Sequence, residues 1–442
     1  MKLGKHFLFL MFLCAIVLCA GFVGNIKLTK AESKTIVVPD DFSSIQVAVD
    51  EALEGDTVFV KSGFYYNQTV IIDKGISLIG ENKTSTTIFG DWTLNGTVVL
   101  VLHDGVIVQN LSLCSVDNSG SSGRAIHLLN VHDCFVSNCI SLNNGIGIWL
   151  YDSSENILED NYITGEHTIP FSAGIKLQYS HLNSISSNSI IDHQYGFGVV
   201  LNNSNKNNVT RNYISNNYHG IWLNASNTNN LTDNNVSLTR NIFATTSENA
   251  ILGSFGIRLF SSNNTKISGN IVSSIPKGIQ IVATSNFNCI ENNTITNSTY
   301  GLELAHNSTS NLFDKNKLSN SNYGLMIQYA SNNTLSANNI TNNQVGANFE
   351  YSDYNLVYHN NFINNTIQIS NIDIVSENKW DKSSEGNYWS NYNGTDNIGN
   401  GIGDTPYIID ESNQDNYPFT NPIDIKTIPE FPSWFISLIP LV

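Results

Sequence analysis

The 442-residue sequence is poor in charged residues, and above all in basic ones. Charged residues make up 13% of the chain, and 21 Lys and Arg stand against 37 Asp and Glu, which gives a formal net charge of −16. Binding to nucleic acid depends on Lys and Arg that neutralise phosphates, so this balance argues against DNA or RNA as a partner. It also argues against polyanionic glycans unless a cation bridges them to the protein.

The chain lacks the signatures of helical and leucine-rich repeats, although it is strongly repetitive. A unit of Gly, an apolar residue, any residue and a second apolar residue recurs every 22–27 residues, with one gap of 36. This period is too short for a pair of helices, and the Leu-x-x-Leu-x-Leu pattern is absent. The glycine slot is filled by Gly147, Gly174, Gly198, Gly220, Gly256, Gly278, Gly301, Gly324 and Gly346, with Ala125 marking an earlier, less regular copy.

Each unit continues with Asn-x-Ile/Leu/Val-x-x-Asn-x-Ile/Leu/Val, so polar turns separate three short apolar pieces. Three brief strands per repeat are typical of one coil of a parallel β-helix. About ten regular coils of about 22 residues are expected over residues 125–379. The repeated Asn residues are predicted to form ladders at the corners, where each side-chain amide bonds backbone and the amide stacked on it. Their role is therefore interpreted as structural.

The start of the chain is predicted to be a targeting segment followed by a cap. Residues 1–31 have the form of a signal peptide, with Lys2 and Lys5 before an apolar run and a cleavage site near Ala31. An uncleaved signal anchor is the alternative, because the run is near the minimum spanning length. Residues 32–124 are assigned to an N-terminal cap and irregular first coils.

The cap is expected to contain strands at 36–38, 57–60, 69–72 and 76–79, and an amphipathic helix after the first of them. A capping box at Ser43–Gln46 would open the helix and Gly55 would close it. Apolar residues with helical spacing would face the first coil and cover its open edge: Ile45, Ala48, Val49, Ala52 and Leu53.

These motifs carry a family resemblance. Ile45-Gln46-x-Ala48-Val49, Gly55–Val60 and Gly63-x-Tyr65 resemble the start of pectin-lyase-like right-handed β-helix proteins. The repeats resemble the carbohydrate-binding and sugar-hydrolase (CASH) family and its NosD-like branch, over roughly residues 35–420. The resemblance implies an all-β, single-stranded, right-handed parallel β-helix. It specifies the fold far better than the activity, which in this family includes glycan binding, polysaccharide cleavage and copper-site assembly.

Residues 380–420 are predicted to form a C-terminal aromatic and acidic cap. Asn387–Tyr392 is similar to the ending of many NosD-like proteins, and its aromatic residues are expected to close the last coil. Asp396, Asn400 and Asp404 lie among glycines, which suits either a capping turn or a calcium loop. The capping turn is the preferred interpretation, and calcium is the one cofactor considered for this loop.

Residues 421–442 form a Pro-rich tail with a short apolar end. Ile428–Ser433 is similar to the Pro-Glu-Phe ending of archaeal surface proteins, in which a membrane-spanning helix follows. Only nine residues follow here, which is too few to cross a bilayer. We therefore expect contact with a membrane only through the N-terminal segment or a processed C-terminal tail.

The variable position of the Gly-apolar-x-apolar strand is the predicted binding surface. Because the apolar residues point inward, x points outward, and stacking places every x in one column: His127, Trp149, Lys176, Val200, Trp222, Arg258, Gln280, Glu303, Met326 and Asn348. A second column lies two residues later, and the two longest insertions precede this strand. The predicted ligand site is Trp149, Tyr151, Lys176, Trp222, Arg258 and Phe260, whose exposed rings would stack on a sugar.

Catalytic residues are not identified. A glycosidase needs two carboxylates about 5–9.5 Å apart, whereas Glu303 and Glu350 are two coils apart and distant from the aromatic residues. Asp152 has no evident partner, and no Asp cluster accompanies Lys176 or Arg258. The polygalacturonase-like Asp-Asp and Arg-x-Lys signatures are missing. A binding protein is therefore preferred, with a polysaccharide lyase or glycoside hydrolase as the alternative.

A copper site is the second alternative, because soft ligands lie close in sequence: His127, His132, Cys134 and Cys139, with Cys114 one coil earlier. Cys134 falls in an Asn slot and is expected to point into the coil, so copper is not expected. A disulfide among Cys114, Cys134, Cys139 and Cys289 stays open. The sequence thus predicts a secreted or cell-surface monomer, archaeal in type, that binds polysaccharide or surface glycan.

Overall fold

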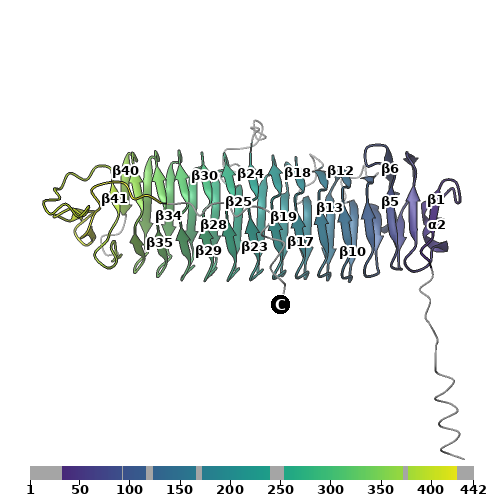
Figure 1. The fold of residues 1–442 in the computed structure, drawn as a ribbon, viewed down its shortest axis with the longest axis horizontal. Coiled ribbons are helices and arrows are strands. Elements are labelled where there is room, and N and C mark those ends of the chain that lie inside the picture. The colour runs from purple at the N-terminus through teal and green to yellow at the C-terminus, as the bar shows by residue number, and fades with distance from the viewer. Residues whose placement is uncertain are drawn as a thin grey trace, which may run out of the picture. The chain divides into compact units, whose positions relative to one another are not determined.

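The repeats build three parallel sheets that run side by side along a β-helix (Figure 1). The computed structural model describes residues 32–91, 93–115, 123–165, 172–238, 253–371 and 377–425. The chain from Thr35 onward forms one unit, distinct from the segment that ends at Lys34. The predicted fold is confirmed. The total number of coils exceeds the ten regular ones that were predicted, because irregular coils at the ends bring two of the three sheets to 14 strands.

The first sheet contains β1 (Thr35–Val38), β2 (Thr57–Val60), β5 (Ser77–Gly80), β8 (Ile107–Gln109), β11 (Phe135–Ser137), β14 (Ile157–Glu159), β17 (Ser184–Ser186), β20 (Asn208–Thr210), β23 (Asn230–Thr232), β26 (Lys266–Ser268), β29 (Cys289–Glu291), β32 (Leu312–Asp314), β35 (Thr334–Ser336) and β38 (Leu356–Tyr358). The third sheet contains β3 (Gly63–Tyr65), β6 (Thr86–Phe89), β9 (Ser112–Cys114), β12 (Ile140–Asn144), β15 (Tyr162–Gly165), β18 (Ser189–Ile191), β21 (Tyr213–Ser215), β24 (Asn235–Ser237), β27 (Ile271–Ser273), β30 (Thr294–Thr296), β33 (Lys317–Ser319), β36 (Asn339–Thr341), β39 (Asn361–Ile363) and β41 (Tyr388–Trp389).

The second sheet carries the glycine slots. Its 13 strands are β4 (Val70–Ile72), β7 (Thr97–Val101), β10 (Arg124–Leu129), β13 (Ile146–Tyr151), β16 (Ala173–Gln178), β19 (Phe197–Asn202), β22 (His219–Asn224), β25 (Phe255–Phe260), β28 (Lys277–Val282), β31 (Tyr300–Ala305), β34 (Tyr323–Gln328), β37 (Val345–Glu350) and β40 (Ile367–Asn371). From β10 to β37 it holds the ten coils that the glycine pattern predicts.

Close packing between coils explains the repeated glycine. A Cβ added to Gly220 would stand 2.2 Å from the backbone oxygen of Gly256 in the next coil, and 2.4 Å from a methyl of Val236. The Gly256 oxygen is part of the backbone and cannot move without breaking the sheet, so a side chain does not fit at position 220. The same contact with the next coil recurs from Gly147 to Gly346.

The asparagine ladders are confirmed. Oδ1 of Asn234 accepts the backbone N–H of Asn212 at 3.0 Å and its side-chain Nδ2–H at 2.9 Å. The Asn234 amide in turn donates to the Val209 carbonyl at 2.8 Å and to Oδ1 of Asn270 at 2.9 Å. Each ladder residue therefore satisfies buried backbone groups as well as its own amide. The ladder at the second Asn position of the repeat contains Asn161, Asn188, Asn212, Asn234, Asn270, Asn293, Asn316, Asn338, Asn360 and Asn387.

The N-terminal helix covers the first coil as expected, but its details differ from the prediction. Helix α2 (Ile45–Glu51) buries Ile45, Ala48 and Val49, and Ser44 at its N-cap makes no side-chain capping hydrogen bond. The prediction of a capping box is therefore wrong. The Gln46 amide instead pairs with the backbone of Ile71 in β4, accepting at 2.7 Å and donating at 3.1 Å.

Two further N-terminal expectations change. Leu53 was assigned to the apolar face of the helix, yet it lies beyond the last turn and is 69% exposed. Strand β3 was not predicted, because Gly63 and Tyr65 break the apolar alternation that marks the other strands. The strands expected at 36–38, 57–60, 69–72 and 76–79 correspond to β1, β2, β4 and β5.

The aromatic residues of the C-terminal cap close the last coil, as predicted. Trp389 stacks on Phe362 and on Tyr407, with ring centroids 4.4 Å apart in both pairs. Asp415 continues the asparagine ladder by accepting the backbone N–H of Asn387 at 2.7 Å and the Trp389 indole N–H at 2.8 Å. A two-stranded antiparallel sheet, β42 (Tyr407–Ile408) and β43 (Gln414–Asp415), completes the cap.

Several predictions lie outside the described residues. They are the signal peptide at 1–31, the tail at 426–442, and most of the two insertions, at 166–171 and 239–252. Within the described part of the chain, no helix is long and apolar enough to cross a membrane. The boundaries of the assigned regions stay predictions.

Candidate functional site

The outward face of the second sheet carries three rows of side chains. The middle row is the predicted column, and strand pairing places its members in register from His127 through Trp149, Lys176 and Val200 to Trp222 and beyond. The third row, two residues later, includes Tyr151 and Phe260. A further row, just before the glycine slot, was not predicted. It supplies Arg124, Phe197, His219, Phe255 and Lys277.

The glycine explains why the sequence did not reveal this row. In β22, His219 and Trp222 are partly exposed, whereas Gly220 and Ile221 between them are both buried. The alternation of exposed and buried residues therefore breaks at Gly220 and Ile221. Counting every second residue back from Trp222 reaches Gly220 and then leaves the strand. His219, three positions before Trp222, is therefore missed although it lies on the same face.

The first group of site residues surrounds Trp149. His127, one coil earlier, stacks on the indole at a centroid distance of 4.6 Å and an interplanar angle of 8°. The Arg124 guanidinium lies 4.2 Å from the ring centroid, and the Lys176 ammonium, one coil later, lies 5.0 Å from it. Tyr151 meets the indole edge-on at 5.9 Å. Strands on both sides of β13 therefore contribute cations or rings to one indole.

The second group surrounds Trp222 three coils later. Phe197 stacks on Trp222 at 5.2 Å and on His219 at 4.8 Å, and His219 stacks on Phe255 at 4.0 Å. The Arg258 guanidinium lies 5.4 Å from the rings of both Phe255 and Phe260. In the middle row Val200 lies between Lys176 of the first group and Trp222 of the second, so the six predicted residues lie on one face but form two groups.

The arrangement changes the expected mode of contact. Trp149 and Trp222 are half-buried and stack on rings of neighbouring coils, whereas exposed ring faces were predicted. A sugar ring therefore has no free indole face to cover at Trp149, where His127 and Arg124 come from β10 and Lys176 comes from β16. The polar groups beside the rings, rather than the ring faces, are the chemistry that this face offers.

Burial keeps the two histidines of this face neutral. Burial is the main cause, and the charge of Arg124 the second, that lowers the pKa of His127 to about 4. Burial, followed by the charge of Arg258, lowers the pKa of His219 to about 3. Burial also lowers the pKa of Lys176, and the nearby charge of Arg124 adds to that shift. With both histidines neutral, the basic side chains on strands β10 to β25 of this face are Arg124, Lys176 and Arg258.

The downstream part of the same face is paired within itself. Glu303 forms an ion pair with Lys277 at 3.1 Å and accepts a hydrogen bond from Gln280 at 2.8 Å. Glu350, which lies in the third row, accepts from Gln328 at 2.8 Å. The two carboxylates considered for catalysis thus lie in different rows and have separate partners. Asp152 lies in the turn after β13 and is exposed.

The oxygens of the predicted calcium loop are bound by the loop itself. Asp396 accepts the backbone N–H groups of Gly399 at 2.7 Å and of Gly401 at 2.8 Å. Asp404 accepts from Asn397, and Asn400 accepts the N–H of Ile402 at 2.9 Å. This pattern is what a capping turn requires. Calcium at Asp396, Asn400 and Asp404 stays a prediction.

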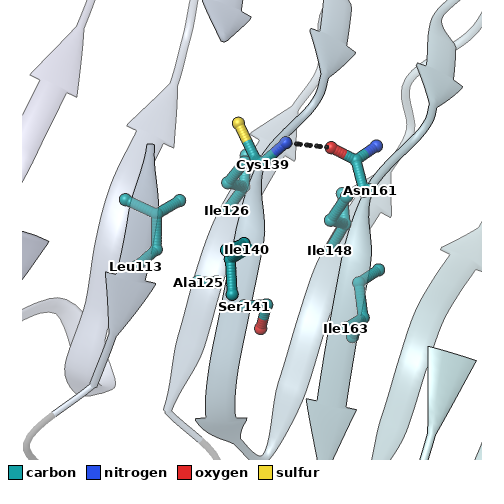
Figure 2. Close-up of a pocket in the computed structure, with 9 residues that line it drawn as sticks. All are labelled: Leu113, Ala125, Ile126, Cys139, Ile140, Ser141, Ile148, Asn161 and Ile163. Atoms are coloured by element: carbon teal, nitrogen blue, oxygen red, sulfur yellow. Dashed lines mark hydrogen bonds between the residues drawn. The ribbon is translucent and has the colours of Figure 1, made fainter. Parts of the chain in front are cut away.

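The cysteines beside the proposed copper ligands belong to the interior. Figure 2 shows Cys139 among the residues that line a small gap, with its backbone N–H bonded to Oδ1 of Asn161 at 3.0 Å; Leu113, Ile148 and Ile163 line the same gap. The small internal gap between these residues is thus part of the core. Cys134 is equally buried in its Asn slot, as predicted, and burial raises the pKa of Cys134 to about 11 and of Cys139 to about 12. No disulfide joins the four described cysteines, Cys114, Cys134, Cys139 and Cys289.

Comparison with known proteins finds proteins that are similar to this chain in sequence and in fold. A family model described as periplasmic copper-binding protein (NosD) matches residues 49–251 and 235–394. A cell surface glycoprotein of Methanothermus fervidus is 26% identical in an alignment 254 residues long, which covers 48% of this chain and 39% of the relative. The match therefore spans well under half of that relative's length.

Solved structures share the fold at low sequence identity. The surface adhesin PfbA of Streptococcus pneumoniae has a TM-score of 0.57 at 13% identity, over 72% of this chain and 89% of that one. A PL6 alginate lyase in complex with a trisaccharide has a TM-score of 0.57 at 10% identity, over 78% and 89%. The Dettilon tailspike protein has a TM-score of 0.55 at 14% identity, over 69% and 67%. Since the family model covers most of the β-helix, the chain belongs to the NosD family of right-handed parallel β-helix proteins.

Proposed function

We propose that this chain is an extracytoplasmic, cell-surface protein that binds carbohydrate through the upstream half of the outward face, formed by β10, β13, β16, β19, β22 and β25. The observation that carries the proposal is the concentration of rings and unused polar groups there. Trp149, Tyr151, Lys176, Trp222, Arg258 and Phe260 all lie on it, and Arg124, His127, Phe197, His219 and Phe255 join them.

Unused hydrogen-bonding capacity is the strongest support. Twelve buried side-chain polar atoms have no partner in the described part of the chain, and six of them belong to this half-face: Arg124 Nε, His127 Nε2, Trp149 Nε1, His219 Nδ1, Trp222 Nε1 and Arg258 Nε. Leaving such groups unpaired is costly, so their concentration on one face needs a reason. Sugar hydroxyls, which both donate and accept, would be suitable partners once a ligand displaces the side chains that cover these atoms.

The relatives support the same proposal. The matched family is described as periplasmic, the curated relative is a cell surface glycoprotein, and the fold recurs in a surface adhesin and in an alginate lyase bound to a trisaccharide. These names concern those proteins, and they make a surface location and a glycan ligand reasonable for this one.

A polysaccharide panel tests the proposal. Binding of immobilised neutral and acidic polysaccharides would be measured for the wild type and for the Trp149→Ala, Trp222→Ala double variant. Tyr213→Ala is a matched control, because Tyr213 is an exposed aromatic residue on the third sheet. We expect the double variant to lose binding by about tenfold or more, and the control to keep it. Wild-type protein that binds no polymer, or a double variant that binds as the wild type does, would refute the proposal.

The two alternative functions have less support. A lyase or hydrolase requires a catalytic pair, and Glu303 and Glu350 are each engaged elsewhere. Release of reducing sugar or of an unsaturated product from the same panel would establish an enzyme. For copper, the donor set does not fit, because the described residues contain no group of three His, Cys, Asp or Glu side chains that could hold a metal. The raised pKa values of Cys134 and Cys139 also oppose thiolate ligation.

A further inference from the structure

The upstream half-face has a charge opposite to that of the protein as a whole. Its six strands contain three basic residues, Arg124, Lys176 and Arg258, and no Asp or Glu. The formal net charge of the chain is −16, so this stretch is a local exception. A local field of this kind acts on a ligand within about 10 Å, whatever the net charge of the molecule.

None of these three cations is neutralised by a carboxylate in an ion pair among the described residues. Arg124 and Lys176 lie against Trp149, and Arg258 lies against Phe255 and Phe260. Glu303 acts on Arg258 at a distance, but Lys277 already holds its carboxylate at 3.1 Å. Rings stabilise a half-buried cation less than a carboxylate does, so each cation keeps capacity for an anion.

The three cations also follow the axis of the β-helix. Arg124 is in β10, Lys176 in β16 two coils later, and Arg258 in β25 a further three coils later. With coils about 4.8 Å apart, the separations along the axis are about 10 Å and about 14 Å. A small anion can touch only one of these positions, whereas an extended polymer laid along the axis can reach all three.

We propose that the ligand of this half-face is an acidic polysaccharide, whose carboxylates are bound by Arg124, Lys176 and Arg258 while its hydroxyls meet the polar groups beside the rings. This inference rests on the proposed function and narrows it to one class of glycan. It also revises the expectation, drawn from net charge, that an acidic glycan would need a bridging cation. The downstream half-face, where Lys277 is paired with Glu303, is not part of the site.

The test compares two polymers that share one backbone and differ in whether their carboxyl groups are charged or methyl-esterified. Affinity for polygalacturonate and for the same polymer fully methyl-esterified would be measured by calorimetry with the full chain, in the presence of a calcium chelator. We expect polygalacturonate to bind at least about tenfold more tightly at low salt, and to weaken as salt is raised. Equal affinity for the two polymers would overturn the acidic ligand while the proposed function stands. Failure of every neutral and acidic polymer would instead overturn the proposed function.

Single variants locate the effect. Lys176→Met and Arg258→Met keep the apolar stem against the rings and remove the charge, so each should weaken polygalacturonate binding by about three- to tenfold. Lys317→Met is the matched control, because Lys317 is exposed in β33 on the third sheet, and it should leave affinity unchanged. Thermal unfolding of each variant checks that the fold persists. An equal loss in all three variants, or single-stranded DNA that binds as tightly as polygalacturonate, would overturn the proposal.

Discussion

Asn234 and Trp222 belong to the same coil, yet their surroundings are opposite in kind. At the corner before β24, every polar atom of the Asn234 amide is bonded, with partners in the coils on both sides. On the outward strand β22, the Trp222 indole N–H and a ring nitrogen of His219 are buried without a partner among the described residues. A saturated corner repeats unchanged from coil to coil, whereas an unsaturated face differs in each coil. Saturation therefore marks the part that holds the fold, and the unsaturated face is the part that we propose binds a ligand.

The largest expected effect comes from breaking the ladder. Asn234→Ala removes the acceptor for the Asn212 backbone N–H and the donor to the Val209 carbonyl, both of them buried. Each orphaned group costs about 1–3 kcal/mol, so the free energy of unfolding should fall by roughly 2–5 kcal/mol. Urea unfolding monitored by circular dichroism measures this loss.

A neighbouring residue supplies the control for that variant. Asn235 is the next residue, but it is exposed in β24 and points away from the ladder. Asn235→Ala should change the free energy of unfolding by no more than about 0.5 kcal/mol. Equal losses for the two variants would contradict the structural role assigned to the ladder.

A pH effect of intermediate size is expected at the end of the ladder. Burial raises the pKa of Asp415 from its usual 3.8 to about 6, against hydrogen bonds from Trp389 and Asn387 that oppose the shift. Since the folded pKa lies above the unfolded one, the folded state favours the proton, and stability is lost as pH rises through 6. The C-terminal cap should therefore be more stable at pH 5 than at pH 7, by about 1 kcal/mol.

Urea midpoints at the two pH values measure this difference. Asp415→Asn cannot titrate, and its amide oxygen can still accept the Trp389 N–H, so the variant should lose most of the difference between pH 5 and pH 7. A variant with the same pH dependence as the wild type would show that another group is responsible.

The smallest effect on stability is expected on the outward face. Trp222→Phe keeps a ring to stack on Phe197 and removes an indole N–H that has no partner, so the two changes offset each other. The free energy of unfolding should change by less than about 1 kcal/mol, measured by urea unfolding. If Trp222→Phe lowered the free energy of unfolding as much as Asn234→Ala does, the proposed difference between the asparagine corner and the outward face would be wrong.

Much of the fold could be predicted because each coil repeats the same physical requirements. The glycine slot, the inward apolar residues and the two Asn slots recur at one period, and each was placed correctly from position alone. The middle and third rows of the face were also predicted, since strand alternation fixes them. The capping box failed because Gln46 found a better partner in Ile71, a residue whose position no local pattern indicates.

The candidate site was predicted only in part. The sequence by itself determined that Trp149, Lys176, Trp222 and Arg258 share one row, because register in a solenoid follows from the repeat. Only the tertiary structure decided that the indoles are stacked rather than open, and that Arg124 and His219 join them. The tertiary structure also decided which basic residues are neutralised. Lys277 forms an ion pair with Glu303 in the next coil, whereas Arg258 does not pair with that carboxylate. Such pairing depends on side-chain contacts between residues more than 20 positions apart, and a repeat pattern specifies their alignment but not their conformation.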